Sequence, residues 1–119
     1  MIKNKIIAID YDGTCTEKNE YPNLGVLRDG LKGVIDLLQD NENILILNTC
    51  RKGKELQEAI DFLEENKIHF DYVNENVPFL IEKYGDCRKI YADIYIDDNN
   101  FLQNKDINWY DIFRYFLSY

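Results

Sequence analysis

The sequence lacks the excess of basic residues that marks proteins built to hold nucleic acid. Its 119 residues include 14 Lys and Arg against 22 Asp and Glu, for a formal net charge of −8. This balance disfavours long nucleic acid as a partner, because binding through phosphates needs a basic surface. Much of the acidity is also what an ordinary solvated surface would carry.

Cysteines and long apolar runs are scarce as well. Cys15, Cys50 and Cys87 are an odd number without CxxC spacing, which disfavours a disulfide framework or zinc site and favours a reducing cytoplasm. In the opening MIKNKIIAID the apolar run ends at Asp10 and is too short for a signal peptide. No segment approaches the roughly 20 apolar residues of a membrane helix. We therefore expect a cytoplasmic protein without a membrane partner, folded as a single domain over residues 1–119.

Short apolar runs alternate with segments of helical periodicity. We expect strands over 6–9, 43–49, 70–73 and 92–97, of which the first, second and fourth should be buried. We expect helices from Leu27 to Leu38, from Leu56 to Leu63, over 77–85 and from Trp109 to Leu117. This alternation predicts an α/β fold, a three-layer sandwich with a central parallel sheet covered on both faces.

Polar residues follow each expected strand. They are Asp10 and Asp12 after the first, Asn48, Thr49 and Arg51 after the second, 74–76 after the third, and Asp97 and Asp98 after the fourth. Ligands bind at the carboxyl ends of such strands, so four carboxylates should meet at one edge of the sheet. Gathered carboxylates repel one another unless a cation lies between them, and Mg²⁺ is the hard cation that prefers oxygen ligands and leaves room for a phosphate.

A carboxylate beside a bound phosphate can attack it and form an aspartyl phosphate. Asp10, directly after the strand, is the candidate nucleophile, and Asp12 is placed to act as general acid and then as general base. Thr49 can donate its hydroxyl to the phosphate, and Lys89 can neutralise it. Arg51 either binds the substrate phosphate or is an exposed loop arginine.

Three segments together resemble the motifs of the haloacid dehalogenase superfamily of phosphohydrolases: DYDGT (10–14), NTCR (48–51) and KIYADIYIDD (89–98). The resemblance implies a Rossmann-like core and a Mg²⁺-dependent phosphatase with the roles given above for Asp10, Asp12, Thr49 and Lys89. It also implies a metal held by the Asp10 side chain, the Asp12 main-chain carbonyl, and Asp97 and Asp98. Which of the last two binds directly stays open.

The spacing between the motifs is too short for the cap domain that many members of this superfamily carry, so the chain looks like a small capless member. An open site would take a large substrate or be covered by a partner, and residues 15–24 are the expected flap. The last motif is similar to that of deoxyribonucleotidases, which favours a nucleotide among possible small phosphomonoester substrates. The aromatic cluster at 109–119 could serve a homodimer contact.

Several alternatives remain open from the sequence. Lys83 or Arg88 could replace Lys89 as the phosphate-binding cation, since an extended 89–96 would place Lys89 far from Asp97. Cys50 lacks the pattern of a cysteine phosphatase and is expected to serve packing. A catalytically silent module that binds a phosphorylated ligand or protein is the alternative function. A phosphoacceptor receiver is disfavoured, because the third strand ends in VNEN without an aspartate.

Overall fold

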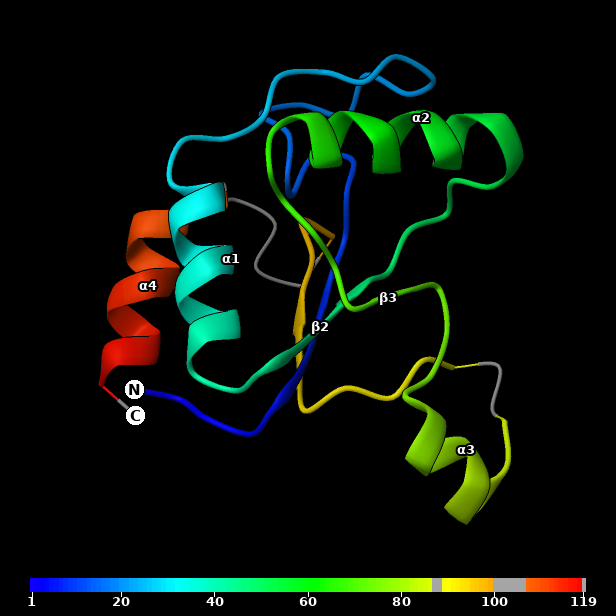
Figure 1. Ribbon diagram of the computed structural model, residues 1–119. Helices are drawn as coiled ribbons and strands as arrows, with labels where there is room; N and C mark the ends of the chain where they lie inside the picture. The colour runs from blue at the N-terminus through cyan, green and yellow to red at the C-terminus, as the bar shows by residue number, and fades with distance from the viewer. Residues whose placement is uncertain (87–88, 100–106, 119) are drawn as a thin grey trace.

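The computed structural model describes residues 1–86, 89–99 and 107–118. Within these ranges one parallel sheet has the strand order β3-β2-β1-β4 (Figure 1). Its strands are β1 (Ile6–Ile9), β2 (Ile44–Leu47), β3 (Tyr72–Val73) and β4 (Ile94–Ile96). The helices are α1 (Leu31–Asp40), α2 (Gly53–Glu65), α3 (Pro78–Tyr84) and α4 (Trp109–Leu117). The α/β fold with a central parallel sheet is confirmed.

Side chains of β1 alternate between the two faces of the sheet and define its layers. Ile7 and Ile9 pack into a large cluster with buried residues of α1, α2 and α4. Ile6 and Ala8 pack into a smaller cluster on the other face, against which Leu80 of α3 is packed. The sheet is therefore the middle of three layers, with helices on both faces, as predicted.

Helix α1 buries a stripe of four residues at helical spacing: Leu31, Val34, Ile35 and Leu38. Leu27, which shares this periodicity, lies outside the helix and forms an isolated bridge with Thr16. The predicted start at Leu27 was therefore too early. Gly30 takes a φ of 82° directly before the helix, a left-handed conformation that interrupts the periodic segment.

Strand β4 is less buried than its sequence suggested. It lies at an edge of the sheet, beside β1, and its middle residue, Tyr95, is 44% exposed. Tyr95 pairs in register with Ala8, so it points to the same face as the smaller cluster. That face is covered by the short helix α3, which has no fully buried residue and leaves part of β4 open.

Strand β1 lies between β2 and β4, so the strand order reverses there: β2 and β3 lie on one side of β1, and β4 lies on the other. A crevice forms at such a switch point outside the carboxyl ends of the strands, and Asp10 and Asp97 directly follow the two strands that flank it. Between β1 and α1 the chain contains no helix that could form a cap. No helix within the described residues has the length and apolar character to cross a membrane.

Asn43 joins three segments at the opposite end of the sheet. Its side chain is 5% exposed, accepts from the Lys5 amide at 3.1 Å, and donates to the carbonyl oxygens of Ile2 at 3.1 Å and Leu38 at 2.9 Å. We expect Asn43→Ala to lower the free energy of unfolding by about 2 kcal/mol or more, because buried main-chain groups lose their partners. Urea unfolding measures this difference.

Asn66→Ala is the matched control. Asn66 is exposed and its side chain makes one hydrogen bond, to the Phe62 carbonyl at 2.8 Å. We expect this control to change stability by no more than about 0.5 kcal/mol. An equal effect of both substitutions would contradict the structural role assigned to Asn43.

Candidate metal centre and active site

Three carboxylates meet where β1 and β4 end. Asp10, Asp97 and Asp98 each offer one oxygen, and these three atoms all lie within 4.8 Å of one another. Asp10 is held in place because its amide donates to the Ile96 carbonyl at 3.0 Å, which continues the pairing of β1 with β4 by one residue. The sheet register therefore brings together acidic residues that are almost 90 positions apart in the sequence.

Gly13 and Thr14 of the DYDGT segment fix the third carboxylate. Gly13 has a φ of +80°, and a Cβ added to it would lie 2.1 Å from Oδ2 of Asp98, so a side chain would displace this oxygen. The Thr14 hydroxyl accepts from the Asp98 amide at 3.0 Å and donates to Oδ2 of Asp10 at 3.4 Å. Our sequence reasoning gave neither residue a role, although both stand inside the motif.

The side chains of Trp109 and Arg28 hydrogen-bond to the loop that contains Gly13 and Thr14. Trp109 at the start of α4 is buried and donates from Nε1 to the Thr14 carbonyl at 3.1 Å. Arg28 donates from Nη2 to the Gly13 carbonyl and from Nη1 to the Ile107 carbonyl, both at 2.8 Å. The loop that carries the acidic residues is therefore tied to the large core rather than left free.

Burial and neighbouring negative charge raise the pKa values of Asp10 and Asp98. Burial, followed by the charge of Asp97, raises the pKa of Asp10 to about 7, and Asp98 and Asp12 add smaller contributions in the same direction. Burial and the neighbouring Asp97 also raise the pKa of Asp98. At neutral pH the ionised cluster is thus electrostatically unfavourable by itself, which is the condition that a bound cation relieves.

The donor set fits Mg²⁺. All three converging groups are carboxylate oxygens, the hard ligands that this ion takes. The Asp12 carboxylate is not part of this group, because it turns toward Arg51. Its main-chain carbonyl remains the group through which Asp12 would reach a metal, as the resemblance implied.

Arg51 and Asp12 form a buried pair. Nε and Nη2 of Arg51 donate to the two carboxylate oxygens of Asp12 at 2.8 and 2.7 Å, and the side chains are 1% and 13% exposed. The remaining guanidinium donors reach the carbonyl oxygens of Pro22 and Glu55 at 3.3 Å and of Asn23 at 2.6 Å. All five N–H groups are engaged, so the predicted contact of Arg51 with substrate phosphate is not what this structure presents.

The same guanidinium holds the expected flap against the site. Its central carbon lies 4.9 Å from the ring centroid of Tyr11 and 5.1 Å from that of Tyr21. The buried Tyr11 hydroxyl donates to the Leu24 carbonyl at 2.7 Å, and burial raises its pKa to about 12. Arg51 thus joins the loop after β1 to the segment after β2.

A cavity of about 530 Å³ opens over the acidic residues. Among the predicted residues, Asp10, Asp12, Thr49, Arg51 and Asp98 line it. Flap residues Asn19 and Tyr21 line it too.

Thr49 is oriented by its main chain and its neighbour. Its amide donates to Oδ1 of Asn74 at 2.8 Å, and its hydroxyl accepts from the Arg51 amide at 3.1 Å, which leaves the hydroxyl hydrogen available to a ligand. Asn74 has a φ of 51°, so it lies in the turn after β3, and its side chain also positions Thr49. Cys50 is exposed and lines the cavity, so its expected role in packing was wrong.

Lys89 does not line the cavity over the acidic residues. Its Nζ lies 5.6 Å from the centroid of the Tyr95 ring, and the residue lines a different cavity beside α3. Lys83 lies on α3 with its Nζ 5.2 Å from the centroid of the Tyr84 ring. Arg88, the other alternative, lies outside the described residues.

The acidic cluster predicts how pH and Mg²⁺ affect stability. The pKa of Asp10 is raised above its unfolded value near 4, so its favourable contribution is complete at low pH and is lost as pH rises through about 7. We expect Mg²⁺ to raise the melting temperature more at pH 8 than at pH 5.5, where protons compete for the site. Asp10→Asn should melt higher than the wild type at pH 8 without metal and respond weakly to Mg²⁺.

Asp61→Asn provides the matched change of charge away from the cluster. Asp61 is exposed on α2, and an asparagine can still accept from Gln57. We expect it to keep the full response to Mg²⁺. An equal response in both variants would argue against the cluster as the metal site.

The buried pair predicts a large cost for losing its cation. We expect Arg51→Ala to lower the free energy of unfolding by about 3 kcal/mol or more, because the half-buried Asp12 carboxylate and the carbonyl oxygens of Pro22 and Asn23 lose their donor. The adjacent, exposed Lys52 is the control, and Lys52→Ala should leave stability almost unchanged. Urea unfolding of both variants tests this, and a stable Arg51→Ala protein would rule out the structural role of the pair.

Comparison with known proteins agrees with the fold described above. No family model matches the chain, and no curated protein does either. The solved structure of a conserved protein from Bacteroides thetaiotaomicron is similar to it, with 32% sequence identity and a TM-score of 0.85. The match covers 98% of this chain and 92% of that one. The chain therefore belongs to the same protein family as this conserved Bacteroides thetaiotaomicron protein.

Proposed function

We propose that the protein is a Mg²⁺-dependent phosphomonoester hydrolase of the haloacid dehalogenase type. The observation that carries the proposal is the position of Asp10 at the switch point between β1 and β4, with oxygens of Asp97 and Asp98 within 4.8 Å of its own. The motifs around these residues supply the expected chemistry. The substrate would be a small phosphomonoester, and a nucleotide belongs to this class.

In this proposal the reaction proceeds in two displacements. A bound Mg²⁺ would supply positive charge against the phosphoryl oxygens. An Asp10 oxygen attacks phosphorus while the bond from phosphorus to the leaving oxygen breaks. The leaving oxygen takes a proton from Asp12. A water molecule then gives a proton to Asp12 and attacks the aspartyl phosphate, which releases phosphate and restores Asp10. The Thr49 hydroxyl donates to a phosphoryl oxygen throughout.

The Arg51 contact limits when Asp12 can act. Both Asp12 oxygens accept hydrogen bonds from Arg51, so the carboxylate is oriented but must give up one contact to hold a proton. In the second displacement the ionised carboxylate is already the form needed to accept a proton from water. Arg51 therefore positions Asp12, and substrate binding would have to loosen the pair for the first displacement.

The same contact favours a second candidate function. A protein in which Asp12 stays paired with Arg51 could bind a phosphorylated ligand at the acidic centre without turning it over. This catalytically silent module would still need Mg²⁺ to bind phosphate, because the carboxylates alone would repel it. Turnover, rather than binding, separates the two candidates.

The mechanism predicts that activity depends on both the metal and Asp10. We expect wild-type protein to hydrolyse phenyl phosphate with Mg²⁺ and to lose this activity in excess chelator. Asp10→Asn should fall to the uncatalysed rate, because an amide cannot act as the nucleophile. Phosphate release measured on the full chain gives these rates, with Asp61→Asn as the active control.

Each other outcome has a distinct meaning. Turnover retained by Asp10→Asn would contradict the aspartyl-phosphate mechanism. Wild-type protein that binds phosphate with Mg²⁺ but hydrolyses none of a panel of phosphomonoesters would favour the silent module.

A further inference from the structure

Tyr21, the aromatic residue of the flap, lines the cavity over the acidic centre. Its side chain is 56% exposed, and it shares the lining of this cavity of about 530 Å³ with Asp10, Asp12 and Thr49. The volume is in the range of sites that hold small molecules. The proposed mechanism gives Tyr21 no role, so an accessible ring lies beside the reacting groups without an assigned function.

Hydrogen bonds hold the main chain around Tyr21 in place. The Asn23 amide donates to the Glu20 carbonyl at 2.8 Å and closes a turn that contains Tyr21. Arg51 donates to the carbonyl oxygens of Pro22 and Asn23, at 3.3 and 2.6 Å. A ligand that contacts Tyr21 therefore does not need to order this part of the loop first, which lowers the entropic cost of binding.

Arg51 covers one face of the Tyr21 ring. Its central guanidinium carbon lies 5.1 Å from the ring centroid, within the range of a cation–π contact. Because Arg51 occupies this face, the opposite face of the exposed ring is the one left for a ligand. Another flat ring is a favourable partner for such a face, because two stacked aromatic rings gain more than the burial of their area alone.

The Tyr21 ring lies close enough to Asp12 to meet the leaving group that Asp12 would protonate. Arg51 joins the two, because Nη2 lies 2.7 Å from Oδ1 of Asp12 and the guanidinium carbon lies 5.1 Å from the Tyr21 centroid. These contacts limit the distance from the carboxylate oxygen to the ring centroid to about 9 Å. In phenyl phosphate the ring is bonded directly to the leaving oxygen, and stacked rings have centroids about 4.5–7 Å apart. A phenyl ring whose ester oxygen meets Asp12 can therefore reach Tyr21.

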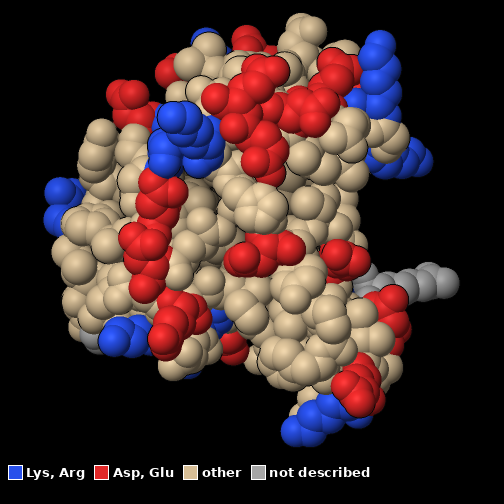
Figure 2. All heavy atoms as spheres, in the orientation of Figure 1, with Lys and Arg blue, Asp and Glu red and all other residues tan. Residues whose placement is uncertain are grey.

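The charge of the protein makes an uncharged contact important for a phosphate ester. The chain has a formal net charge of −8, and acidic side chains are spread over the face that Figure 2 shows. A phosphomonoester is also anionic, so apart from the metal it gains little from the long-range field of the protein. Stacking on Tyr21 does not depend on this field and can distinguish one phosphomonoester from another.

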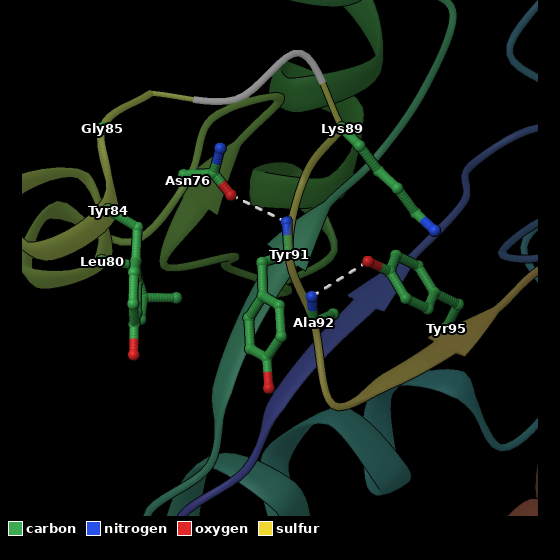
Figure 3. Close-up of a pocket in the computed structure, with 8 residues that line it drawn as sticks. All are labelled: Asn76, Leu80, Tyr84, Gly85, Lys89, Tyr91, Ala92 and Tyr95. Atoms are coloured by element: carbon green, nitrogen blue, oxygen red, sulfur yellow. Dashed lines mark hydrogen bonds between the residues drawn. The ribbon is translucent and has the colours of Figure 1, made fainter.

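A larger cavity, of about 690 Å³ beside α3, contains other tyrosines but cannot supply this contact. Figure 3 shows Tyr84 and Tyr91 in it, and it shares no lining residue with the cavity over the acidic centre. The Tyr91 hydroxyl donates to Oδ1 of Asp93 at 3.0 Å, and Oδ2 of Asp93 accepts from the Ile6 amide at 2.8 Å. Ile6 is the first residue of β1 and Asp10 follows its last, so the larger cavity lies toward the opposite end of the strand.

We propose that Tyr21 is a specificity-determining residue that stacks on an aromatic leaving group of the substrate. The inference deepens the proposed phosphatase function and rests on it. The preferred substrates are then phosphomonoesters whose flat ring is attached at the ester oxygen, as in aryl phosphates. An aliphatic phosphomonoester would keep the contacts of its phosphate with the metal and Thr49 but would gain no stacking on Tyr21.

The first test is equilibrium binding of two compounds that cannot be hydrolysed. Benzylphosphonate has a methylene group in place of the ester oxygen of phenyl phosphate, and propylphosphonate has the same charge without a ring. Each is titrated into the full chain with Mg²⁺ by calorimetry. We expect wild type and Tyr21→Phe to bind benzylphosphonate about tenfold more tightly than propylphosphonate, and Tyr21→Leu to reduce this ratio to about two.

The ratio within each variant isolates the ring contact, because a general loosening of Arg51 in Tyr21→Leu would weaken both compounds alike. Tyr84→Leu is the matched control, since Tyr84 is an exposed tyrosine that lines the larger cavity, and it should keep the wild-type ratio. Wild-type protein that does not bind benzylphosphonate, or binds both compounds equally, would overturn the inference. An unchanged ratio in Tyr21→Leu, or a ratio lost in Tyr84→Leu, would also overturn it.

Kinetics separate this inference from the proposed function. If the protein is a phosphatase, Tyr21→Leu should raise KM for phenyl phosphate about fivefold with little change in kcat, and leave KM for glycerol phosphate unchanged. Hydrolysis of both substrates with KM values that Tyr21→Leu leaves unchanged would reject the role of Tyr21 and retain the phosphatase. A preference for benzylphosphonate without any hydrolysis of phenyl phosphate would retain the ring contact and reject the phosphatase.

Discussion

Mutual repulsion among three carboxylates at the carboxyl ends of β1 and β4 is the constraint on which the rest of the site depends. Burial and neighbouring charge raise the pKa of Asp10 to about 7, so at neutral pH the metal-free centre is a source of instability. A chain that keeps such a cluster must hold it rigidly, because free loops would move the charges apart. The proposed metal function gives this strain a use, since a divalent cation converts repulsion into shared coordination.

Much of the surrounding structure serves to hold these charges in place. Gly13 leaves space for the Asp98 carboxylate, and Thr14 hydrogen-bonds to the segment that carries it. Trp109 and Arg28 anchor the carbonyl side of the same turn to the core. Arg51 then orients Asp12 and binds the flap, so a single buried guanidinium connects the acid–base residue with the loop that borders the cavity.

The sequence predicted the architecture well because the alternation of apolar runs and helical periodicity is a property of local segments. Asp10, Asp97 and Asp98 were predicted to lie together because parallel strands end at one edge. The rest required three-dimensional information. The pairing of Asp12 with Arg51 depends on how two loops meet, and the exposure of Tyr95 depends on how little of one face α3 covers. Neither the burial of Arg51 nor the exposure of Cys50 has a signal in the spacing of residues.

The measurement that tests the central claim most directly is a crystal structure of the full chain grown at pH 8 with Mn²⁺. This ion substitutes for Mg²⁺ and can be located by its anomalous scattering. Our account predicts one anomalous scattering peak between the Asp10, Asp97 and Asp98 carboxylates, lost in crystals of Asp10→Asn. Crystals of the wild type without a peak at this position, or with the ion bound elsewhere on the acidic surface, would contradict it.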